Sequence, residues 1–122
     1  MLVRLACCVL LAFAAAGLRV AHAADCAQEI SQLMSRDTEK LTSRYNKATR
    51  QIEKQGSSAR LVAEECRVAR QLRPRLEDQI AALKQSGCSK DPNVGAMIAD
   101  IVRGHQDDLA MMQKSMSKPE CR

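Results

Sequence analysis

Cysteines are the residues of this sequence whose spacing most restricts the chemistry they can do. The 122-residue chain has six, and two of them lie in an N-terminal apolar stretch. The other four, Cys26, Cys66, Cys88 and Cys121, are separated by 40, 22 and 33 residues. A zinc site needs closely spaced ligand pairs and a thioredoxin-like site needs Cys-x-x-Cys, so we expect neither. The spacing favours two structural disulfides.

The N-terminal segment predicts export to a compartment where disulfides form. Residues 1–23 resemble a secretory signal peptide, with a positive charge at Arg4 and an apolar run over residues 5–18. That run is too short to span a membrane comfortably. Small residues in the sequence Ala-His-Ala end the segment, so we expect cleavage after Ala23. The mature chain would be periplasmic or secreted, with no transmembrane segment.

Potential copper ligands gather near the C-terminus. His105 is the one histidine after residue 23, and Asp108, Met112 and Met116 follow it at helical spacing. Histidine and methionine are ligands that suit Cu(I), so a periplasmic copper site at these four residues is our alternative hypothesis. Methionine also fills gaps in a core, and this chain has almost no aromatic residues to do so. We favour the packing interpretation and expect no cofactor.

Basic residues gather in the middle of the chain and form a candidate binding patch. Such a patch would bind an anionic surface of the cell envelope or an acidic partner protein. Glutamates are interleaved with the bases, a pattern that is also typical of ordinary solvated helix faces. The candidate residues are Lys47, Arg50, Lys54, Arg60, Arg67 and Arg70.

Charge and motif content narrow the function further. Cleavage removes two arginines and leaves 17 basic and 14 acidic residues, a net charge of +3. This mild charge, together with export, argues against a nucleic-acid partner. The sequence has no serine–histidine–acid motif and no phosphate-binding loop, so we do not expect an enzyme. We predict a small exported protein that binds another macromolecule or serves a structural or envelope-stress role.

The elements that would position these residues are helices. Residues favourable to helix dominate the sequence, and apolar residues recur at spacings of 3 and 4 over three segments. We expect helices at about 26–55, 59–86 and 92–117, with a kink or short break in the second at Pro74. Short loops predict an up-down-up three-helix bundle in one domain, residues 24–122.

This topology selects the cysteine pairs. Cys66 and Cys88 lie about 33 Å apart along one helix, beyond the reach of a disulfide. Cys26 and Cys66 would lie at opposite ends of the first two helices. The predicted pairs are therefore Cys26–Cys88 and Cys66–Cys121. Because the apolar stripes are narrow, we expect these two bonds to supply a large share of the stability.

Overall fold

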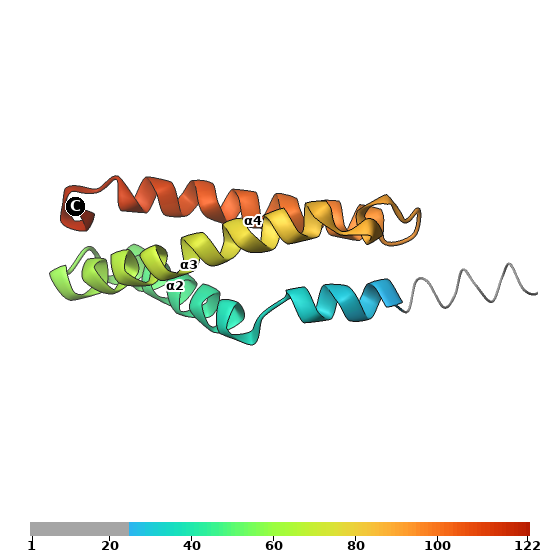
Figure 1. Ribbon diagram of the computed structural model, residues 1–122. Coiled ribbons are helices and arrows are strands. Elements are labelled where there is room, and N and C mark those ends of the chain that lie inside the picture. Colours follow the sequence, from blue (N-terminus) through green and yellow to red (C-terminus); the bar gives the residue numbers. More distant parts are fainter. Residues whose placement is uncertain (1–24) are drawn as a thin grey trace, which may run out of the picture.

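The computed structural model describes residues 25–122, and every regular element in that range is helical (Figure 1). The predicted all-helical class is confirmed, while the predicted signal peptide, residues 1–23, lies outside the described residues. Over residues 25–122, none of the helices combines the length and the apolar character that crossing a bilayer requires. The elements are a helix over residues 25–33, α2 (Arg36–Gln55), α3 (Ala59–Gln85), η1 (Gly87–Lys90), α4 (Gly95–Met116) and η2 (Pro119–Cys121), the two η elements being short 3-10 helices.

The first predicted helix, 26–55, is wrong as one continuous element, because the chain leaves the helical path at Met34 and Ser35. Ser35 has extended backbone angles, and its hydroxyl accepts a hydrogen bond of 3.2 Å from the backbone N–H of Asp37. This is an N-cap, and Asp37 and Glu39 add negative charge to the first turn of α2, where the helix dipole favours it. Local capping thus begins a new helix within the apolar repeat.

The junction between α2 and α3 lies at residues 56–58, where the predicted helix bounds place it. Gly56 has φ of 81°, the left-handed region that favours glycine, and its N–H donates to the carbonyl of Ile52 at 2.9 Å. Ser58 caps α3 by accepting from the N–H of Leu61 at 3.2 Å. From there α3 continues through Pro74 to Gln85, so the helix has no break at the proline.

The third predicted helix begins three residues later than its predicted start at 92. The Asp91 carboxylate accepts from the backbone N–H groups of Asn93 and Val94, at 2.8 and 3.0 Å, and so stabilises a turn that precedes α4. The helix then starts at Gly95, where a side-chain Cβ would lie only 2.7 Å from the carbonyl oxygen of Ser89. Glycine at this position therefore permits η1 to pack closely against the start of α4.

The apolar core extends along α3, which contacts both α2 and α4 (Figure 1). It divides into three clusters. The largest surrounds Cys26 and Cys88, the second surrounds Leu72, and the smallest contains only Val62, Cys66 and Cys121 as buried members. The core therefore becomes thinner toward the end of the molecule where the C-terminus lies.

Two disulfides join the helices. Cys26 is bonded to Cys88 with Cα atoms 5.6 Å apart, which ties the helix over residues 25–33 to η1. Cys66 is bonded to Cys121 with Cα atoms 5.4 Å apart, which ties α3 to η2. These are the two pairs that helix geometry predicts from the sequence.

Candidate functional site

A cavity of about 710 Å³ follows one face of α2 from the break at Met34 to Lys54, and we call it the α2 groove. Its α2 residues recur every three or four positions, so they share one face of the helix. Gln79 of α3 and His105 of α4 complete the lining. The α2 groove is lined by Met34, Ser35, Thr38, Glu39, Thr42, Ser43, Asn46, Lys47, Arg50, Gln51, Lys54, Gln79 and His105.

Gln79 brings a buried hydrogen-bond acceptor to the α2 groove. Its side chain is only 7% exposed, and its Nε2 donates to the carbonyl oxygen of Leu33 at 3.1 Å. That bond satisfies a carbonyl at the end of the helix over residues 25–33, which the break leaves without a helical partner. It also assigns the other amide atom, Oε1, as the acceptor, and Oε1 is buried without a partner in the described part of the molecule. Such an atom loses its bond to water and gains none in return.

His105 brings a second unpartnered polar atom to the same cavity. Its Nε2 is buried and has no hydrogen bond to any described residue. Burial lowers the pKa of His105, and the Asp108 carboxylate, one turn further along α4, acts in the opposite direction. Burial likewise raises the pKa of Asp108, which the charge of His105 opposes and the charge of Asp107 reinforces. The imidazole is therefore uncharged at neutral pH, where it can donate or accept one hydrogen bond at each nitrogen as its tautomer dictates.

Three bases form the outer wall of the α2 groove. Lys47, Arg50 and Lys54 are all exposed and lie at positions i, i+3 and i+7 of α2. No acidic side chain between residues 25 and 122 forms an ion pair with any of them. The one acid of the lining, Glu39, lies two turns or more away along the helix. This wall therefore carries a positive charge that other side chains do not neutralise.

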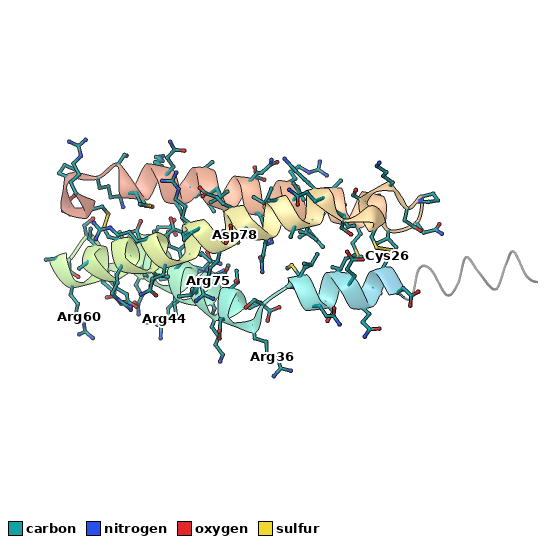
Figure 2. The ribbon with its side chains drawn as sticks, viewed as in Figure 1. Cys26, Arg36, Arg44, Arg60, Arg75 and Asp78 are labelled. Carbon is teal, nitrogen blue, oxygen red and sulfur yellow. A yellow bond between two sulfur atoms is a disulfide. The ribbon has the colours of Figure 1, made fainter. Side chains whose placement is uncertain are left out.

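The remaining bases of the predicted patch lie elsewhere and are partly engaged. Arg67 and Arg44 donate to the Glu64 carboxylate at 2.7 and 2.9 Å. The hydrogen bonds from Arg67 do most to lower the pKa of Glu64, and Arg44 lowers this pKa further. Burial acts in the opposite direction. Arg70 donates to the carbonyl oxygen of Cys121. Arg60 projects into solvent (Figure 2). It also lines a second hollow, of about 800 Å³. The structure thus divides the six predicted residues into two groups of three, and Lys47 of the first group lines both hollows.

The structure places the two methionines of the copper hypothesis in the core. Met112 has no exposed surface and packs among Leu41, Tyr45 and their neighbours in the second core cluster. Met116 packs against the same cluster, so both methionines serve the core. A metal ion at Met112 would have to displace packed side chains. Among the residues that the structure describes, no three histidine, cysteine or acidic side chains are grouped for metal binding.

The chemistry of the α2 groove suits reversible binding. Hydroxyl and amide groups line most of its length, bases line one end, and Gln79 and His105 supply polar atoms that have no partner within the protein. Sequence reasoning identified the bases and His105, but it missed Gln79 and the hydroxyl-rich face. Comparison with known proteins found no match to any family model, curated protein or solved structure.

Proposed function

We propose that this chain is a small exported helical protein that binds an anionic segment of another envelope macromolecule in the α2 groove, without catalysing a reaction. The proposal includes cleavage after Ala23 and a mature domain, 24–122, with up-down-up helix order. The two disulfides favour an oxidising destination, as does the apolar N-terminal segment. N-terminal sequencing of the protein exported by its host would test the cleavage site.

One observation carries the binding proposal: three bases without ion-pair partners line the same cavity as Gln79 and His105, and each of these two side chains holds a buried polar atom that has no partner. Lys47, Arg50 and Lys54 repel one another along one helix face. Gln79 and His105 each hold an unsatisfied atom away from water, which costs free energy. An anionic ligand with hydrogen-bond donors would remove both penalties at once. These features therefore indicate a site that is complementary to something outside the chain.

The test compares two variants that change the net charge equally. In the groove variant, Arg50→Glu and Lys54→Glu reverse two charges on the wall of the cavity, at residues that do not line the second hollow. In the control variant, Arg36→Glu and Arg75→Glu reverse two exposed charges that do not line it (Figure 2). Fluorescence anisotropy would measure binding of labelled poly-L-glutamate and, separately, labelled polygalacturonate at low salt.

We expect the groove variant to bind at least one of these polyanions about tenfold more weakly than the unmodified protein, and the control variant to lose less than about threefold. The difference should shrink as salt is added, because screening weakens exposed charge interactions. Equal losses for the two variants would mean that binding follows net charge alone, and the proposed function would then be wrong.

A further inference from the structure

We propose that the natural occupant of the α2 groove is an extended acidic peptide segment of a partner protein. Its backbone N–H groups would donate to Gln79 at the end of the groove near Met34, which we call the inner end. Its acidic side chains would lie against Lys47, Arg50 and Lys54. This inference rests on the proposed function and adds the class of ligand to it.

The inner end of the groove requires a hydrogen-bond donor. Gln79 donates one N–H of its side-chain amide to the carbonyl of Leu33, and the amide atom that has no partner is the acceptor Oε1. A carboxylate or phosphate at this point would set one acceptor against another. A group that satisfies Oε1 must therefore carry N–H or O–H, while the anionic groups of the ligand bind at the bases. Two different chemistries are thus needed on one ligand.

The length of the groove requires a chain rather than a small anion. From Ser35, the N-cap of α2, to Lys54 the lining spans a separation of 19 residues, which in a helix extends over about 28 Å. An extended peptide covers about 3.3 Å per residue, so about eight residues fill this length. Such a peptide presents an N–H and a carbonyl at every residue to the hydroxyl and amide groups that line the groove, among them Thr42, Ser43 and Asn46.

The composition of the lining favours a peptide over a nucleic acid or a glycan. Single-stranded nucleic acids gain much of their affinity by stacking bases on aromatic side chains. The flat apolar face of a sugar ring likewise gains from contact with a flat apolar side chain. Tyr45, the one aromatic residue between 25 and 122, does not line the groove: it is buried, and its hydroxyl is 2.8 Å from that of Ser115. A peptide backbone needs no such platform.

The experiment measures binding of a synthetic array of acetylated octapeptides in which the number and position of glutamates vary. The tightest binder is then remade with N-methyl groups in place of individual backbone N–H donors. Both ligands are titrated against the oxidised mature protein and against Gln79→Met, with Gln71→Met as the matched control, because Gln71 is an exposed glutamine of the same helix that lies outside the groove. Gln79→Met also removes the hydrogen bond to Leu33. A second variant, His105→Phe, therefore changes the same cavity while leaving that hydrogen bond in place and keeping a ring of similar volume.

We expect acidic peptides to bind with micromolar dissociation constants and neutral ones not to bind. One N-methyl position should weaken binding about fivefold, and Gln79→Met should weaken binding of the unmethylated peptide similarly. In Gln79→Met the methyl group should then have little further effect, because both changes remove the same hydrogen bond. His105→Phe should weaken peptide binding, while Gln71→Met should leave it unchanged.

The failures of the two proposals are distinguishable. If polygalacturonate binds in a manner sensitive to Arg50→Glu and Lys54→Glu while no octapeptide binds, the peptide inference is wrong and the proposed function stands. If peptides bind but methylation and Gln79→Met act independently, the donor role of the peptide backbone is wrong. If neither class of polymer responds to reversal of the groove bases, both proposals are wrong.

Discussion

Each end of this molecule has a disulfide bond, but the two bonds lie in different surroundings. The Cys26–Cys88 bond lies within a cluster of eight buried residues, with Leu33, Met34, Ile101 and Leu109 packed around it. The Cys66–Cys121 bond lies in a cluster of three buried residues, with only Ile52 packed against it. The two closed loops are nearly equal in length, at 62 and 55 residues.

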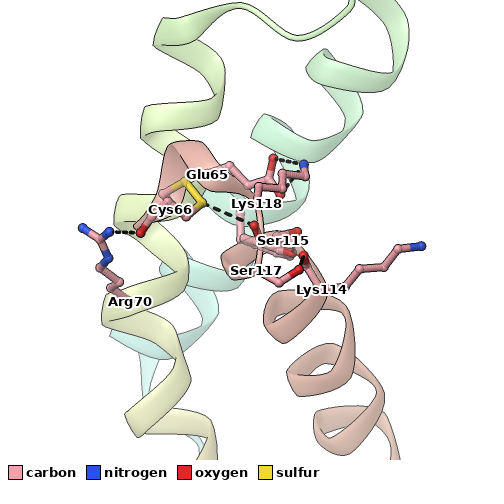
Figure 3. The surroundings of a disulfide bond; sticks show 9 residues. Glu65, Cys66, Arg70, Lys114, Ser115, Ser117 and Lys118 are labelled. Atoms are coloured by element: carbon pink, nitrogen blue, oxygen red, sulfur yellow. Dashed lines mark hydrogen bonds and ion pairs between the residues drawn. A yellow bond between two sulfur atoms is a disulfide. The ribbon is translucent and has the colours of Figure 1, made fainter.

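Polar contacts take the place of apolar packing at the Cys66–Cys121 end. The Lys118 ammonium lies 3.4 Å from the carboxylate of Glu65, a residue that is 1% exposed (Figure 3). Arg70 donates to the carbonyl oxygen of Cys121. The Cys121 sulfur also lies 3.3 Å from the carbonyl oxygen of Ser115. The Cys26–Cys88 bond therefore reinforces a core that already holds its helices together. The Cys66–Cys121 bond instead holds a short C-terminal tail that has little apolar packing of its own.

Loss of both bridges should produce the largest effect. In the chain-entropy model, loops of these lengths contribute about 4 kcal/mol each, against a total stability of about 5–15 kcal/mol for a domain of this size. We expect the reduced protein to melt more than about 25 °C lower than the oxidised one, or to be a loose helical ensemble at 37 °C. Circular dichroism melts with and without reductant measure this. A sharp transition within a few degrees of the oxidised protein would show that the core is stronger than we infer.

Removal of one bridge at a time should separate the two ends. Cys26→Ser/Cys88→Ser and Cys66→Ser/Cys121→Ser should each cost roughly 4 kcal/mol of global stability. Their local effects should differ, and amide hydrogen exchange measures them. Without Cys66–Cys121, the amides of Lys118, Cys121 and Arg122 should lose protection, because the tail has little other packing.

The matched amide at the opposite end is that of Met34, which donates to the carbonyl of Ile30 at 3.0 Å. It should retain measurable protection without Cys26–Cys88, since the large cluster still packs there. Equal loss of protection at both ends would contradict the comparison, because the bonds alone would then be holding both segments.

A pair of identical substitutions should reveal the unequal packing more directly. Val102→Ala deletes two methyl groups from the large cluster, and Val62→Ala deletes the same groups from the small one. We expect losses of about 2 and about 1 kcal/mol, because the thin cluster relaxes around the cavity more completely. Urea denaturation of the oxidised variants measures both. A larger loss for Val62→Ala would reverse our ranking of the two ends.

The smallest expected effect concerns His105 in the α2 groove. Burial lowers its pKa in the folded protein below the ordinary value of 6.5, so the unfolded chain takes up a proton first as the pH falls. The contribution of His105 to stability is therefore complete above pH 6.5 and is lost as the pH falls through the lower, folded pKa. Because the raised pKa of Asp108 acts in the opposite sense at acid pH, the measurement uses an Asp108→Asn background. In this background the urea midpoint should decline as the pH is lowered from 7.5 to 5.5, and His105→Gln should make the midpoint nearly independent of pH over this range. If the decline persists in His105→Gln, a group other than His105 causes it.

From the sequence we predicted the bridges but missed the start of α2. Helix length alone excludes Cys66–Cys88. The antiparallel order of the first two helices then excludes Cys26–Cys66, because these residues would lie at opposite ends of the hairpin. The break at Ser35 is hidden because Met34, Thr38 and Leu41 continue the apolar spacing across it. A signal did exist: Ser35 followed by Asp37 and Glu39 is a capping residue followed by the acids that favour a first turn.

The α2 groove was predictable only at its charged end. The spacing of Lys47, Arg50 and Lys54 places them on one face in any helix. Gln79 looks like a polar residue beside the apolar stripe of α3, and its role depends on the Leu33 carbonyl, which the unpredicted break leaves at a helix end. Because the contact joins residues 46 positions apart, no local pattern could reveal it.

If the α2 groove is the binding surface of this protein, as we propose, an NMR titration should locate a bound acidic peptide there. The oxidised mature protein, labelled with ¹⁵N, would be titrated with the tightest acidic octapeptide while its ¹H–¹⁵N spectrum is recorded. We predict that the largest shift changes occur at the side-chain amide of Gln79 and at the backbone amides of groove residues such as Asn46 and Arg50. Largest changes at Arg60 and Arg67 of the second hollow, or changes spread evenly over the surface, would contradict the proposal.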